Sequence, residues 1–238
     1  MQSLLRLAFP PQCISCAGLV EREFGLCGSC WRDTPFTTGL VCDCCGVPLP
    51  GEDDGHGDKC DDCMTIARPW SRGRAALIYT NNARRLVLAL KHGDRLDLAK
   101  PMAQWMAGAG QDLLQDNTVI VPIPAHRLRL VQRRYNQAAV LGNTLSKTLN
   151  RRCIPDLLIR TRQTKVQDGM MRADRFANMA EAIKPSKSAA QKLDGRPVLL
   201  VDDVVTSGAT MAAAADACHA IGAQRVDVLA LARVAKDV

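Results

Sequence analysis

Nine of the eleven cysteines in this 238-residue chain lie between residues 13 and 63, and eight of them form four Cys-x-x-Cys pairs. Two residues between paired cysteines form a tight turn that aims both sulfurs at one ion, and two such pairs complete a closed tetrahedral site. In a reducing compartment this spacing favours metal thiolates over disulfides. It predicts two structural zinc sites, with the ligands Cys13, Cys16, Cys27, Cys30, Cys42, Cys45, Cys60 and Cys63.

The spacing does not fix how the four pairs combine. The first pair can join the second and the third the fourth, or the pairs can interleave. Cys44 lies between the ligands of the third pair, and we interpret it as a bystander because four ligands fill a tetrahedral site.

Charge divides the chain in the same way as cysteine. Residues 1–70 carry 5 basic and 10 acidic side chains, a net charge of −5, whereas residues 71–238 carry 26 and 14, a net charge of +12. Zinc thiolates make the first part more negative still, so a phosphorylated or polyanionic ligand is expected on the second part. Aromatic residues make up 4% of the chain, which argues against a base-stacking platform. We predict two domains, 1–70 and 71–238.

The N-terminal residues do not resemble a targeting segment. Their short apolar stretch is broken by Arg6 and lacks a small-residue cleavage site. The sequence also has no run of 18 apolar residues, so no membrane insertion is expected. We expect a soluble, cytoplasmic protein.

The second part alternates apolar strand patterns with helical patterns. Strands are predicted at 75–79, 118–124, 157–159, 198–201 and 226–231, helices at 83–91, 96–107, 135–149 and 210–221, and a long loop or hairpin insertion at 161–178. Strands that are apolar on both faces and separated by helices indicate an α/β fold with a mostly parallel sheet. Ligands of such sheets bind at the carboxyl ends of strands, here after Val121, Ile159 and Val201.

The segment from Val198 to Thr210 combines an apolar run, two acids and a hydroxyl-rich turn before a helix. The carboxylates of Asp202 and Asp203 can accept hydrogen bonds from the vicinal hydroxyls of a ribose. A turn at a helix N-terminus offers backbone N–H groups to a monophosphate, and Gly208 permits a close approach. The predicted turn residues are Thr206, Ser207, Gly208, Ala209 and Thr210.

This segment resembles the PRPP-binding motif of type I phosphoribosyltransferases. A wider stretch, from Val121 to His126 and then from Arg127 to Ala138, resembles the signature of the ComF family of competence-associated proteins. The helix ending at Lys91 and the residues 167–178 fit the same family. Its members join an N-terminal double zinc ribbon to a phosphoribosyltransferase-type domain. One departure is Arg134, which stands where the family has a glycine.

The resemblance implies a role for each matching residue. Asp202 and Asp203 would hold the ribose hydroxyls, and the turn at 206–210 would hold the 5-phosphate. Mg²⁺ would bridge oxygens of the pyrophosphate and the ribose. Arg127 would stabilise the departing charge as a catalytic residue alongside the two acids. The remaining implied phosphate-binding residues are Ile123, Ala125, His126 and Lys91.

Two functions follow from these observations. The first is a PRPP-binding phosphoribosyltransferase-type protein that serves DNA uptake or linked nucleotide metabolism, with PRPP or ribose 5-phosphate as its ligand. The alternative is a zinc-ribbon adaptor that binds single-stranded DNA and a helicase-like partner and has a non-catalytic PRPP site. The sequence contains no base-recognition pattern that we can identify, so it leaves turnover open.

Overall fold

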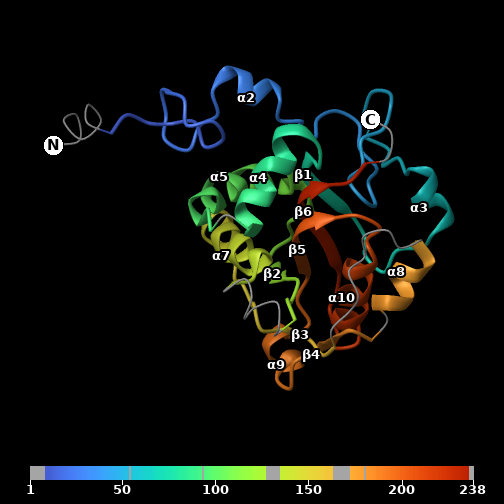
Figure 1. The fold of residues 1–238 in the computed structure, drawn as a ribbon. Coiled ribbons are helices and arrows are strands. Elements are labelled where there is room, and N and C mark those ends of the chain that lie inside the picture. Colours follow the sequence, from blue (N-terminus) through green and yellow to red (C-terminus); the bar gives the residue numbers. More distant parts are fainter. Residues whose placement is uncertain are drawn as a thin grey trace.

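The computed structural model describes residues 9–53, 55–92, 94–126, 135–162, 172–179 and 181–235. Within them, a central sheet of four parallel strands has the order β1-β6-β5-β2. These strands are β1 (Gly73–Ile78), β2 (Val119–Pro122), β5 (Val198–Val205) and β6 (Val226–Arg233). The predicted α/β fold with a mostly parallel sheet is confirmed (Figure 1).

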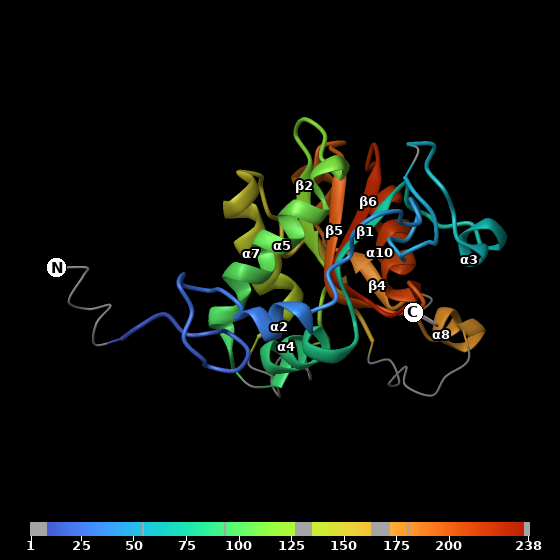
Figure 2. The same cartoon turned by 90° about the horizontal axis from the view of Figure 1, so that it is seen from above.

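Helices cover both faces of this sheet. Three of them pack on one face: α4 (Asn81–His92), α5 (Ala99–Ala109) and α7 (Gln137–Leu149). The other face is covered mainly by α10 (Ala209–His219), whose alanines pack closely on β5 and β6. Figure 2 shows the two helical layers on opposite sides of the strands. Every residue of β2 and β6 is buried, as a parallel sheet between two helical layers requires.

The strand predicted at 157–159 is present but belongs elsewhere. It forms β3 (Leu158–Arg160), which pairs antiparallel with β4 (Ile183–Pro185) in a separate two-stranded sheet. The expectation that Ile159 ends a strand of the main sheet was therefore wrong. Between β3 and β4, the described residues include the helix α8 (Arg172–Met179). The other short elements are α2 (Gly28–Arg32), α3 (Asp61–Thr65), η1 (Leu96–Leu98), η2 (Gln111–Leu113) and α9 (Ala189–Leu193).

The N-terminal part covers the outer edge of the central sheet at β1. The N–H of Thr37 donates to the carbonyl of Ala76 at 3.0 Å, and the N–H of Ile78 donates to the carbonyl of Pro35 at 2.9 Å. An edge strand exposes unpaired backbone groups that invite association with other chains. The chain pairs this edge with its own residues 35–37, so the cysteine-rich part and the sheet are continuous in hydrogen bonding.

None of the helices that the structure describes is both long enough and apolar enough to cross a membrane.

Gly73 lies where the cysteine-rich part presses on the start of β1. A Cβ atom at this position would lie 2.6 Å from the carbonyl oxygen of Cys44 and 2.9 Å from a methyl carbon of Val228. Both distances are too short for non-bonded atoms, and one contact is with backbone, which cannot rotate away.

We therefore expect Gly73→Ala to lower the free energy of unfolding by about 1–3 kcal/mol, as overpacking does. The matched control is Gly108→Ala in α5, where an added Cβ meets no atom within 4 Å. There we expect a gain of about 0.5–1 kcal/mol from the lower entropy of the unfolded chain. Denaturant unfolding of the zinc-loaded protein measures both, and wild-type stability of Gly73→Ala would contradict the packing argument.

Candidate functional site: two cysteine clusters, the acids of β5 and the turn before α10

The eight paired cysteines gather into two clusters. One contains Cys13, Cys16, Cys27 and Cys30 and the other Cys42, Cys45, Cys60 and Cys63, each with its sulfurs within 4.8 Å of one another. Consecutive pairs therefore combine, and the interleaved arrangement is excluded. Cys44 belongs to neither cluster, in agreement with its interpretation as a bystander.

The sulfur geometry fits zinc. A tetrahedral ion with Zn–S bonds of about 2.3 Å separates its sulfurs by about 3.8 Å. The Cys16 and Cys27 sulfurs are 3.6 Å apart, and the Cys45 and Cys60 sulfurs 3.7 Å. A disulfide needs about 2.05 Å, so these are not disulfide pairs. Four sulfur ligands per cluster leave no position for a substrate, and the two zinc sites are structural.

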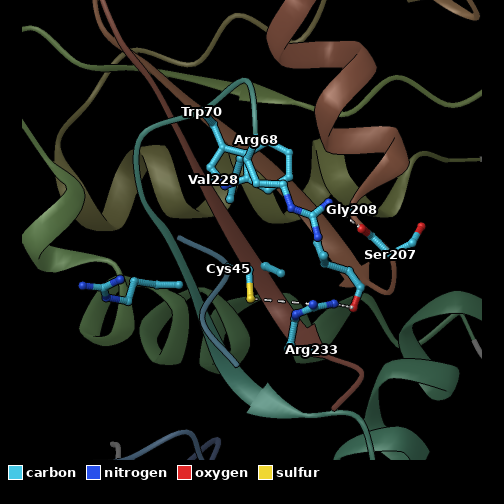
Figure 3. A pocket seen from close by; sticks show the side chains of 10 residues that line it. Cys45, Arg68, Trp70, Ser207, Gly208, Val228 and Arg233 are labelled. Carbon is cyan, nitrogen blue, oxygen red and sulfur yellow. Dashed lines mark hydrogen bonds between the residues drawn. The ribbon is translucent and has the colours of Figure 1, made fainter. Parts of the chain in front are cut away.

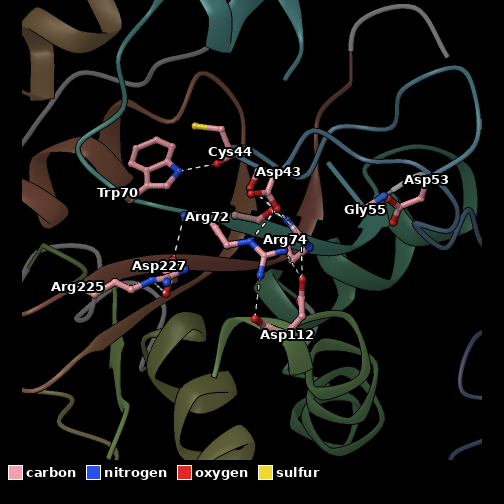
Figure 4. Close-up of polar contacts among 11 residues, drawn as sticks. Asp43, Cys44, Asp53, Gly55, Trp70, Arg72, Arg74, Asp112, Arg225 and Asp227 are labelled. Carbon is pink, nitrogen blue, oxygen red and sulfur yellow. Dashed lines mark hydrogen bonds and ion pairs between the residues drawn. The ribbon is translucent and has the colours of Figure 1, made fainter. Parts of the chain in front are cut away.

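The second cluster, Cys42/Cys45/Cys60/Cys63, is fixed to the sheet by charged side chains (Figure 4). One carboxylate oxygen of Asp43 lies 2.8 Å from Nε of Arg72, the residue before β1, and 2.7 Å from a terminal guanidinium nitrogen of Arg74 in β1. Both arginines also contact Asp112. The hydrogen bonds from Arg74 and Arg72 hold the pKa of Asp43 below its usual value, although partial burial opposes them. This network orients the cysteine loop on the sheet.

Asp202 and Asp203 lie inside β5, not after it, because the pairing of β5 with β6 continues to Val205. Asp203 is 8% exposed, and its Oδ2 lies 3.1 Å from Nζ of Lys91 at the end of α4. The N–H of Asp203 donates to the Oδ1 of Asp202 at 2.8 Å. The structure thus brings the two predicted acids and the predicted Lys91 together.

Asp202 has an unusual proton affinity. Burial, followed by the negative charge of Asp203, raises the pKa of Asp202 to about 7, although Lys91 and Arg160 oppose the shift. Two adjacent carboxyl groups in a partly desolvated position resist simultaneous ionisation. A ligand that donates a hydroxyl hydrogen bond to Asp202 would favour its ionised form.

Three residues within the second stretch of the family signature position this site, and sequence reasoning did not assign them a role. The hydroxyl of Tyr135 donates to the carbonyl of Leu90 at 2.6 Å, and the side chain of Gln137 donates to the carbonyl of Lys91 at 3.3 Å. Asn136 caps α7 by accepting from the N–H of Ala138, at 3.1 Å. The motif therefore holds the end of α4, from which Lys91 reaches Asp203.

The loop after β2 leaves the sheet at the same edge as the acids, since Pro122 pairs with Val201. The N–H of Ile123 donates to the carbonyl of Val201 at 2.9 Å, and the carbonyl of Ile123 accepts from Asn136. The backbone of Ile123 is thus used by the fold, which corrects its expected role as a phosphate donor. Ala125 and His126 are half-buried beyond it. Arg127 lies outside the described residues.

The predicted phosphate turn connects β5 to α10. Gly208 is the N-cap of α10 with φ of 83°, a left-handed conformation that glycine adopts without strain. Ser207 and Ala209 are buried, and Thr206 and Thr210 are half-buried. The first N–H groups of a helix have no acceptor within that helix, so this end can bind an anion.

Two arginines hold the carbonyl groups of this turn. Arg233, at the end of β6, donates through one nitrogen to the carbonyls of Val205 and Thr206. Arg68 donates to the carbonyl of Ser207 at 2.9 Å. Figure 3 shows both guanidinium groups beside the turn, with Arg233 extending toward Cys45.

These contacts orient the amides of the turn. In a trans peptide the C=O of one residue and the N–H of the next point in opposite directions. Since the arginines bind three successive carbonyls, the N–H groups of residues 206–208 point away from the cysteine cluster. The sequence offered no signal for this, because Arg68 and Arg233 are distant from the motif along the chain.

Comparison with known families agrees with this arrangement. Residues 4–64 match the Double zinc ribbon domain family, and residues 117–237 match the Phosphoribosyl transferase domain family. The chain belongs to the phosphoribosyl transferase domain family. The predicted division at residue 70 falls between the two matched regions and stays a prediction.

Curated relatives match almost the whole chain. Competence protein F of Haemophilus influenzae is 25% identical over 228 residues, covering 93% of this chain and 96% of its own. The DNA utilization protein YhgH of Escherichia coli K12 is 28% identical over 234 residues, with 95% and 99% covered, and that of Salmonella typhi is 29% identical over 236 residues, with the same coverage. The resemblance to the ComF family is confirmed.

The two cysteine clusters predict a zinc content of two ions per chain. Cys42→Ser removes a ligand of the second cluster, so we expect about one zinc per chain instead of two and a lower unfolding midpoint. Cys44→Ser is the control, because it replaces a neighbouring buried cysteine outside both clusters. Metal analysis after desalting measures the content, and loss of zinc in Cys44→Ser would contradict the ligand assignment.

The pKa of Asp202 generates a pH prediction. The folded protein holds this proton up to a pH of about 7, whereas an unfolded aspartate releases it near 3.9. The folded state therefore binds more protons between these values, and Asp202 lowers stability as pH rises. From pH 5 to pH 8 we expect wild type to lose stability relative to Asp202→Asn in denaturant titrations. Asp194→Asn, at a 75% exposed side chain, should leave the pH dependence of the free energy of unfolding as in wild type. Parallel plots of this free energy against pH for wild type and Asp202→Asn would refute the raised pKa of Asp202.

Proposed function

We propose that this protein binds PRPP at the carboxyl edge of the sheet. The 5-phosphate would lie on the turn at 206–210, where the N–H groups of residues 206–208 point away from the two arginines and the helix dipole of α10 adds a positive field. The ribose hydroxyls would donate to Asp202 and Asp203. The observation that carries this proposal is the placement of the two acids in β5 next to Lys91, directly before the turn that leads to α10.

The pyrophosphate would lie toward the loop after β2. Ala125 and His126 stay the predicted phosphate-binding residues of that loop, whereas the N–H of Ile123 already donates to Val201. We propose that Mg²⁺ accompanies PRPP and bridges ligand oxygens, as a hard cation does. Arg127 retains its proposed role as a positive charge next to the leaving group.

The chemistry that such a site supports is transfer of the phosphoribosyl group. The bond between C1 of the ribose and the pyrophosphate oxygen breaks, and an incoming nucleophile forms the new bond to C1. Positive charge develops on the ribose ring and negative charge on the leaving group. The Asp202–Asp203 pair faces the first and basic side chains stabilise the second, which is electrostatic catalysis by fixed groups.

The names of the relatives suggest the cellular context. One is a competence protein and others are DNA utilization proteins, and we propose that this chain likewise serves DNA uptake or the use of its products. Single-stranded DNA and a helicase-like partner are proposed partners for the basic residues 71–238, and the cytoplasm is the proposed location. The match to the Phosphoribosyl transferase domain family does not favour the alternative hypothesis, a DNA-binding adaptor with a non-catalytic PRPP site, over PRPP binding.

Calorimetric titration of Mg²⁺-PRPP into the zinc-loaded protein tests the proposal. We expect saturable binding that falls at least about ten-fold, or about 1.4 kcal/mol, in Asp202→Asn/Asp203→Asn, because the ribose hydroxyls lose charged acceptors. Asp194→Asn, which removes one exposed carboxylate before the start of β5, is the control for loss of a surface charge. Pyrophosphate release on adding candidate bases then tests turnover.

Binding that is equal in the double variant and wild type would contradict the assignment of the acids. Absence of binding to the intact, zinc-loaded wild type would overturn the PRPP proposal as a whole.

A further inference from the structure

Arg233 is a buried arginine in an unusual position. It is 5% exposed, and in the part of the chain that the structure describes no carboxylate lies within ion-pair distance of it. An arginine cannot lose its proton in a protein, so its charge must be balanced where it lies. Its Nη1 donates to the carbonyls of Val205 and Thr206, and its Nη2 lies 3.8 Å from the sulfur of Cys45.

The second cluster supplies the missing negative charge. Four thiolates and one zinc ion carry a net charge of −2, and thiolates bound to zinc remain deprotonated. Arg233 thus lies between two partners: the zinc thiolate cluster on one side and the backbone of the phosphate turn on the other (Figure 3).

A second connection runs parallel to this one. The indole N–H of Trp70 donates to the carbonyl of Cys44 at 2.6 Å, which fixes the tryptophan to the cysteine loop. The guanidinium of Arg68 lies 5.4 Å from the ring centre of Trp70 and donates to the carbonyl of Ser207. A Cβ at Gly208 would lie 3.0 Å from the Trp70 ring, so the turn packs directly on it.

We propose that Arg233 is a positioning residue that couples the second zinc site to the phosphate turn, so that zinc and a ribosyl phosphate each strengthen binding of the other. The proposal rests on the proposed PRPP function for its ligand. Loss of zinc would free the cysteines from their fixed positions, so that the contact between Cys45 and Arg233 no longer holds the guanidinium at the turn carbonyls. Coupling between two sites is reciprocal, so it can be read from the zinc side.

The experiment measures the zinc affinity of the second site by competition with a chelator, with Mg²⁺ alone or with saturating Mg²⁺-PRPP. We expect PRPP to raise this affinity about ten-fold in wild type, a coupling of about 1.4 kcal/mol. The first site, whose Cys30 lies beside Arg85 of α4 and not beside the turn, should change less than about two-fold. Cys42→Ser, which keeps only the first site, assigns the two steps of the titration.

Arg233→Gln should abolish the coupling. Arg196→Gln is the matched control, since Arg196 pairs with the exposed Asp194 at 3.6 Å on the surface. Arg233→Lys guards against misfolding of the glutamine variant. A lysine keeps the charge but cannot bridge Cys45 and the turn with separate nitrogens, so we expect near-normal zinc content and no coupling.

A ligand-independent measurement separates this inference from the PRPP proposal. In Arg233→Gln, and in Cys42→Ser, amide hydrogen exchange at residues 206–210 should accelerate at least about ten-fold, while residues 119–122 of β2 keep wild-type protection. If wild type binds no PRPP but the turn responds in this way, the function proposal fails, and the link from the second zinc site through Arg233 to the turn stands. Unchanged exchange, or full coupling in Arg233→Gln, would overturn the inference.

Discussion

The packing of the second cysteine cluster against β1 and β6 is the contact on which the ligand site depends. Asp43 holds Arg72 and Arg74, Trp70 donates to Cys44, and the absence of a side chain at Gly73 allows the backbones to meet. Few large apolar side chains take part, so metal coordination and ion pairs must fix this part of the chain. Metal coordination therefore helps to fix the cysteine-rich part on the sheet, and the turn at 206–210 packs on the same Trp70 that this part holds.

In this site the backbone places the carboxylates of β5 and the arginines that bind the turn carbonyls on different sides of the turn. Parallel pairing brings the β2 loop and the acids of β5 to one edge, while the arginines approach the turn from the side of the cysteine cluster. Carbonyls bound by arginine leave their N–H groups directed to the other side. An anionic phosphate can then lie close to Asp202 and Asp203 without meeting turn carbonyls, and Lys91 offsets part of the charge of the acids.

Patterns within a short stretch of sequence predicted their own structures well. Four Cys-x-x-Cys pairs predicted two tetrathiolate sites, and the run from Val198 to Thr210 predicted a strand, a turn and a helix, because local spacing controls these geometries. Which pairs combine came only from the structure. Predictions that depended on distant partners did less well. Leu158–Arg160 is apolar enough for a strand but pairs with β4, and the N–H of Ile123 is taken by Val201 across the sheet. Periodicity gives the type of an element and not its neighbour.

Arg233 shows why the remaining part of the site lay beyond the sequence. Its position at the end of an apolar strand resembles that of any solvated cation, and its role appears only when the cluster at Cys45 and the turn at Thr206 lie on either side of it. A buried guanidinium without a carboxylate is costly unless another negative group balances it. Here zinc-bound thiolates can meet that requirement, whereas neutral thiols cannot. The structural metal is in this sense an electrostatic partner of the phosphate turn, although it lies outside the reacting groups.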